Sequence, residues 1–195
     1  MGKNEETREL IIDSARNRFL QYGFNKTTMA EIAKDCGMSA SNLYRFFKDK
    51  NDILVEMTER CFRDTENCLR EILRRPGMSA AERIKALVLE KLHINYDMIA
   101  NEPKFNEIVM YITSERSDIV CRHKDALISS IAEAVAEGNR NGELEAPDIV
   151  KTADMISKAT IMFGHPMLMN GYSLQELEDS ATEIIETLVQ GLRRR

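Results

Sequence analysis

Apolar residues recur at three- and four-residue spacing along almost the whole chain, which is the pattern of amphipathic helices. No segment shows the sustained alternation of apolar and polar residues that is typical of a strand. Capping and breaking residues divide the pattern into about nine expected helices, at about 5–22, 28–36, 40–45, 49–74, 79–100, 103–113, 117–139, 147–163 and from 173 to the C-terminal arginines. The predicted fold class is therefore all-α.

Two short helices joined by a glycine-containing turn are expected between Thr27 and Lys50. Thr28 with Glu31 has the spacing of a capping box at the start of the first helix. Gly37 ends this helix, since glycine reaches a left-handed backbone at little cost, and Ser39 can cap the second. This is the layout of a helix-turn-helix, whose second helix can enter a major groove of DNA.

The second short helix has an apolar face and a face of small and polar residues. Leu43 and Phe47, four residues apart, are expected to anchor it. Small side chains let a helix approach base edges, asparagine can pair with adenine, and lysines beside a helix start suit a phosphate. The predicted DNA contacts are Thr27, Thr28, Ser39, Ala40, Ser41, Asn42, Tyr44, Arg45, Lys48 and Lys50. Spacing alone leaves open a helical hairpin that never touches DNA.

Residues 8–54 resemble the TetR/AcrR family of bacterial transcriptional regulators. The matching positions are Ile12, Ala15, Phe19, Gly23-Phe24, Thr27-Thr28, Ile32-Ala33, Gly37-Met38-Ser39, Leu43-Tyr44, Phe47 and Lys50. Arg45-Phe46 departs from the family, which often carries a His or Tyr before the final Phe. The resemblance implies a DNA-binding domain over 1–50 and a helical effector-binding and dimerisation domain over 51–195. It also implies a palindromic double-stranded DNA operator, with repression as the usual mode.

The last expected helix carries an apolar stripe suited to packing against another helix. Leu174, Leu177, Ala181, Ile184 and Leu188 are spaced three and four residues apart. The preceding helix is similarly apolar, and the pair could bury this surface within one chain. The resemblance instead implies a four-helix bundle with a second subunit, so we expect a homodimer through the last two helices.

The helical body contains many apolar residues and much of the chain's methionine, which numbers eleven residues. Thioether side chains adapt to irregular apolar ligands, although most such residues belong to an ordinary core. The resemblance implies a cavity here for a small apolar or amphipathic effector. The expected contacts are His93, Tyr96, Phe105, Val109, Tyr111, Ile128 and Met162. An activator or a helical interaction protein that needs no ligand is the alternative.

Charge, hydropathy and cysteine spacing limit the classes of protein to which the chain can belong. The net charge is −5, yet residues 14–50 hold seven Lys/Arg against three Asp/Glu, as expected for a DNA-contacting end on an acidic body. No apolar run has the length of a membrane span and no signal peptide is visible, which favours a cytoplasmic protein without a membrane partner. The four cysteines and three histidines lack metal-binding spacing. No catalytic grouping is visible, so no enzyme activity, metal or cofactor is expected.

Overall fold

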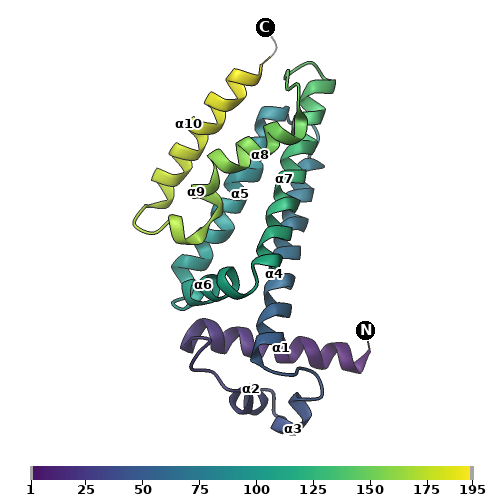
Figure 1. Ribbon diagram of the computed structural model, residues 1–195, viewed down its shortest axis with the longest axis vertical. Coiled ribbons are helices and arrows are strands. Elements are labelled where there is room, and N and C mark those ends of the chain that lie inside the picture. The colour runs from purple at the N-terminus through teal and green to yellow at the C-terminus, as the bar shows by residue number, and fades with distance from the viewer. Residues whose placement is uncertain (1, 194–195) are drawn as a thin grey trace. The chain divides into compact units, whose positions relative to one another are not determined.

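The computed structural model describes residues 2–193 and shows an all-α protein, as predicted (Figure 1). The α-helices are α1 (Lys3–Tyr22), α2 (Met29–Asp35), α3 (Ala40–Leu43), α4 (Lys50–Leu73), α5 (Ala80–Asn101), α6 (Phe105–Glu115), α7 (Ser117–Arg140), α8 (Ile149–Ala159), α9 (Ile161–Gly164) and α10 (Leu174–Leu192). A short 3₁₀ helix, η1, covers Pro166–Leu168. Within residues 2–193, none of the helices has the length and apolar composition needed to cross a lipid bilayer.

Local capping interactions set several helix starts. The Thr28 hydroxyl accepts a hydrogen bond from the Glu31 N–H at 3.3 Å, and the Glu31 carboxylate accepts one from the Thr28 N–H at 2.9 Å. Ser173 starts α10 through the same reciprocal arrangement with Glu176. Asp49 accepts hydrogen bonds from the first turn of α4. These starts confirm the capping predictions, because each depends only on residues close in sequence.

The helix expected over 147–163 is divided into α8 and α9, which accounts for a tenth α-helix among the described residues. The break lies at Thr160, whose backbone leaves the helical region with φ −103° and ψ 14°. Its hydroxyl donates to the Ile156 carbonyl at 2.8 Å. Such back-bonding to the preceding turn competes with the regular ladder and bends helices, so apolar periodicity alone missed the break.

The chain divides into two compact units. The first contains the residues up to Arg63 together with Ile99–Ile119, and therefore includes α6 as well as the helix-turn-helix. Within it, the Lys104 N–H donates to the Leu20 carbonyl at 3.2 Å, and the Tyr111 ring lies 4.6 Å from the Phe24 ring. Long-range packing thus attaches α6 to α1. The expected division into domains over 1–50 and 51–195 stays a prediction.

The second unit contains Asp64–Met98 and the chain from Val120 onward. A buried polar relay runs through its apolar core. The Lys91 ammonium on α5 donates to His123 Nε2 on α7 at 2.9 Å, and His123 Nδ1 lies 3.0 Å from a Glu66 carboxylate oxygen on α4. Lysine has no acceptor, so Nε2 must accept and the neutral ring carries its proton on Nδ1, where it donates to Glu66. The relay joins three helices of this unit.

Candidate nucleic-acid interface

Buried apolar side chains hold α3 against α2. Leu43 on α3 and Ile32 on α2 are both fully buried. Between the helices, Gly37 has the left-handed φ of +65°, and the Met38 N–H returns to the Ala33 carbonyl at 2.9 Å. This tight turn presents the opposite side of α3 outward, as the sequence predicted for a helix-turn-helix.

The outward side of α3 and its C-terminal end carry small and polar residues. Ser41 and Arg45 are exposed, and 54% of Tyr44 is accessible to solvent. Ser39 caps the helix by accepting the Asn42 N–H at 3.2 Å. α3 ends at Leu43, so Tyr44 and Arg45 follow its last turn. The resulting face combines hydrogen-bonding groups, a stacking ring and a guanidinium, all of which can contact DNA.

Two residues expected among the DNA contacts instead bond within the protein. Thr27 is 2% exposed, and its hydroxyl donates to the Gly23 carbonyl at 2.9 Å. The Lys50 ammonium donates to the carbonyls of Phe24, Asn25 and Thr27 at 2.9, 3.2 and 3.0 Å. These bonds use all three of its N–H groups, and burial lowers the pKa of Lys50. In this structure both residues hold the loop between α1 and α2, and their assignment to DNA stays a prediction.

The N-terminus of α2 already holds an anion. The hydroxyl of Thr28 and then its N–H lower the pKa of the Glu31 carboxyl, which remains charged beside the helix start. A phosphate approaching Thr28 would have to displace this carboxylate or lie beside it. Lys48 has an exposed side chain and is the simpler candidate for a phosphate contact.

Sequence reasoning missed a positioning residue on α1. The Arg8 guanidinium donates to the Phe46 carbonyl at 2.8 Å and lies 4.3 Å from the centre of the Phe47 ring. It also pairs with Glu56 on α4. Arg8 thus holds the segment that follows α3. No local pattern could have identified it, because Phe46 is 38 residues away along the chain.

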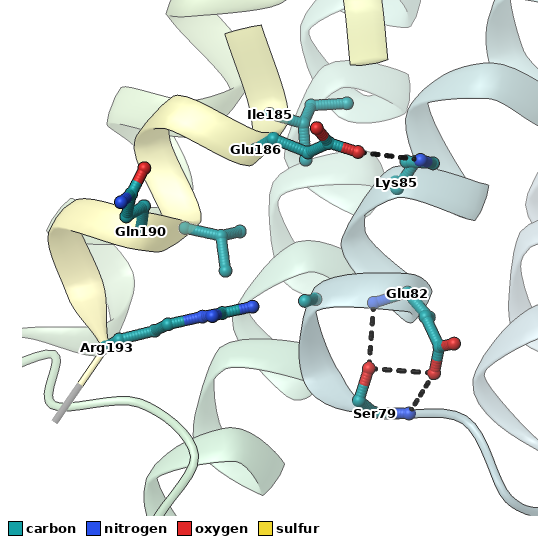
Figure 2. Close-up of a pocket in the computed structure, with 9 residues that line it drawn as sticks. Ser79, Glu82, Lys85, Ile185, Glu186, Gln190 and Arg193 are labelled. Atoms are coloured by element: carbon teal, nitrogen blue, oxygen red, sulfur yellow. Dashed lines mark hydrogen bonds and ion pairs between the residues drawn. The ribbon is translucent and has the colours of Figure 1, made fainter. Parts of the chain in front are cut away.

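The seven expected effector contacts are distributed over both units. Phe105, Val109 and Tyr111 belong to the first unit, whereas His93, Tyr96, Ile128 and Met162 belong to the second. Tyr111 donates to the Asn51 side chain at 2.7 Å, and His93 lies 2.6 Å from Glu178. The cavity shown in Figure 2 is lined by other residues. The effector contacts therefore stay a prediction.

Metal-ligating side chains do not converge in the part of the chain that the structure describes: no group of three or more His, Cys, Asp or Glu is placed to hold an ion. All four cysteines are free thiols. Among the described residues, the clearest candidate for a functional site is therefore the polar face at α3.

Comparison with known proteins identifies the family. Residues 11–57 match the model of bacterial regulatory proteins of the tetR family, and residues 80–185 match that of the tetracyclin repressor-like C-terminal domain. The chain belongs to the TetR family. Its helix-turn-helix is accordingly the DNA-binding part of a transcriptional regulator.

Proteins that match this TetR-family chain over most of its length have low sequence identity to it, and the solved structures among them share its fold. The fatty acid metabolism regulator protein of Bacillus subtilis is 24% identical over 193 residues, covering 95% of each chain. A TetR-family regulator from Mesorhizobium loti has a TM-score of 0.80 at 17% identity, with complete coverage of both chains. SmeT, the repressor of the Stenotrophomonas maltophilia multidrug efflux pump SmeDEF, has a TM-score of 0.68 at 16% identity, covering 96% of this chain and 90% of its own. SmeT has also been solved as a complex with triclosan.

Proposed function

We propose that this TetR-family regulator is a homodimeric repressor that binds a palindromic operator through α3 and is released by a small apolar or amphipathic effector. The observation that carries the operator assignment is the exposed face of Ser41, Tyr44 and Arg45, held outward by the buried Leu43. Lys48 adds an exposed cation beside this face. Base edges would be read by the α3 side chains, with phosphates contacted by the basic residues.

The homodimer part of the proposal rests on an exposed apolar surface on α8, α9 and α10. Val150, Met155, Ile161 and Ile184 are 68%, 57%, 53% and 36% exposed. Large apolar side chains gathered on neighbouring helices favour association, and α8 and α10 pack together. A second copy on this surface would supply the two reading helices, about 34–36 Å apart, that palindromic half-sites require.

The effector part of the proposal is supported by the relatives. One is named for the regulation of fatty acid metabolism, and SmeT is a repressor whose structure has been solved as a complex with triclosan. We propose a ligand of comparable apolar or amphipathic character for this chain. If ligand weakens operator binding, operator must weaken ligand binding by the same factor.

The test is operator binding by the purified protein, measured by fluorescence anisotropy on DNA from upstream of its own gene. Excess random DNA competes, and the salt concentration is varied because non-specific contacts are strongly salt-dependent. The variant Asn42→Ala/Tyr44→Ala is expected to bind at least about tenfold more weakly, since each base contact contributes roughly 1–3 kcal/mol. Unchanged affinity would remove α3 from the interface.

Tyr172→Ala is the matched control, because Tyr172 is 50% exposed but lies between η1 and α10 in the second unit. It should retain wild-type affinity. Light scattering on Met155→Glu/Ile184→Glu tests the dimer separately. This variant is expected to be monomeric, and a dimer of unchanged stability would contradict the proposed interface.

A further inference from the structure

A cavity of about 490 Å³ lies between the start of α5 and the end of α10, both within the second unit (Figure 2). Its volume falls in the range of small-molecule sites, roughly 300–1,000 Å³. The buried side chains of Ile185 and Val189 supply an apolar surface on the α10 side. Ala81 supplies another small apolar group from α5. None of these residues belongs to the proposed DNA-binding face or to the expected effector contacts.

Both walls of the cavity are fixed to the connection between α7 and α8. The Ala80 N–H at the start of α5 donates to the Glu143 carboxylate at 2.7 Å. The Glu145 N–H donates to the Leu192 carbonyl at 2.7 Å, and Leu144 forms an isolated bridge with Arg193. Because one connection holds both walls, the cavity is formed before any ligand arrives, which lowers the ordering cost of binding.

Most charged side chains that line the cavity form ion pairs or hydrogen bonds with neighbouring residues. Lys85 and Glu186 pair with each other at 3.1 Å. One oxygen of the Glu82 carboxylate accepts hydrogen bonds from the N–H and the hydroxyl of Ser79, at 2.7 and 2.8 Å. These bonds, the backbone one first, lower the pKa of Glu82 and keep it anionic. The lining therefore contains fixed negative charge, which disfavours ligands with several anionic groups.

Arg193 differs from the other charged residues of the lining. Its side chain extends from the end of α10 into the cavity (Figure 2), whose lining also includes Val189. Among residues 2–193, no carboxylate lies within ion-pair distance of its guanidinium. A guanidinium presents a planar set of donors that matches a carboxylate in two parallel hydrogen bonds. Arg193, which lines the cavity together with apolar side chains and has no carboxylate partner among residues 2–193, is thus complementary to an amphiphile with one acidic group.

We propose that the cavity between α5 and α10 binds a small monoanionic amphiphile, with its carboxylate on Arg193 and its hydrocarbon part against Ile185 and Val189. A single negative charge satisfies Arg193, whereas a second would meet Glu82 or Glu186. This site goes beyond the proposed repressor function, because its lining shares no residue with the expected effector contacts and none of its contacts requires DNA.

The test uses octanoate as the probe and the full-length protein without DNA, so a failure of operator binding would not affect the result. Methyl-labelled protein is titrated by NMR, and the Ile185 and Val189 signals are followed. Octanoate is expected to shift both signals saturably. Arg193→Gln should raise the Kd for octanoate at least tenfold while leaving the weaker binding of the uncharged analogue 1-octanol unchanged.

Arg140→Gln is the control, because Arg140 is an exposed arginine of the same unit that lies outside the cavity lining. It should bind octanoate as the wild type does. The proposal is overturned if octanoate shifts neither methyl signal, or if Arg193→Gln and Arg140→Gln behave alike. It is also overturned if the signals follow protein concentration and not octanoate, which would mean that a second copy of the chain covers the cavity.

Discussion

The buried relay of Lys91, His123 and Glu66 predicts a specific dependence of stability on pH. His123 lies between an ammonium that donates to Nε2 and a carboxylate that accepts from Nδ1. A second ring proton would have to sit on Nε2, facing the Lys91 ammonium. Burial first, and then the Lys91 charge, lower the pKa of His123 from 6.5 to about 4, against the opposing effect of Glu66. The perturbation we propose is His123→Gln, which cannot titrate.

The sign of the effect follows from where the proton binds. Between pH 4 and 6.5 the unfolded chain holds a proton on residue 123 that the folded chain does not. The free energy of unfolding therefore falls as pH decreases through this window, is fully restored above 6.5, and stops falling on this account below about 4. Between pH 7.5 and pH 5.0 the loss from His123 alone is about 2 kcal/mol.

The assay is urea unfolding followed by circular dichroism at pH 7.5 and pH 5.0. All proteins are compared at the same concentration, because the proposed dimer would make stability depend on concentration. His123→Gln is expected to lose about 2 kcal/mol less than the wild type between the two pH values, even though its stability at pH 7.5 is lower. If His123→Gln shows the same pH difference as the wild type, the assignment of this proton to the relay is refuted.

Three further predictions concern the first unit. Leu43→Ala removes a fully buried side chain beneath α3 and should lower the free energy of unfolding by about 2–5 kcal/mol, measured by urea denaturation; a loss below about 1 kcal/mol would contradict the anchoring role. Lys48→Met should reduce the salt dependence of operator binding by about one unit of slope without changing stability. Lys50→Met should instead lower the free energy of unfolding by about 2–3 kcal/mol, because three carbonyls lose a charged donor, and equal stability of the two variants would refute the clamp.

Much of the helix-turn-helix could be predicted because its determinants are local. The Thr28 and Glu31 cap, the left-handed Gly37 and the Ser39 cap each involve residues within one helical turn. The buried side of α3 also follows from the spacing of Leu43 and Phe47, which places both on one helical face. Such features can be predicted from the spacing and the chemistry of a few neighbouring residues, without knowing how the rest of the chain folds.

Residues that look alike in the sequence have different surroundings in the folded chain. Lys48 and Lys50 are both basic residues after α3, yet Lys48 is exposed and Lys50 binds carbonyls 23 to 26 residues away. The sequence predicts that a lysine lies near the start of a helix. It does not predict which groups of the folded chain surround the lysine side chain. Fractional burial and available acceptors decide whether a lysine binds phosphate or stabilises a loop.

The sequence alone determined the all-α class, the capped starts of α2, α3 and α10 and the apolar anchors of α3, since these depend on periodicity and on contacts within a few residues. Tertiary structure decided that α6 packs with α1, that His123 is buried between Lys91 and Glu66, and that the start of α5 and the end of α10 line a cavity together with Arg193. Each of these depends on residues far apart in the chain, whose proximity is set by the packing of whole helices and carries no local signature.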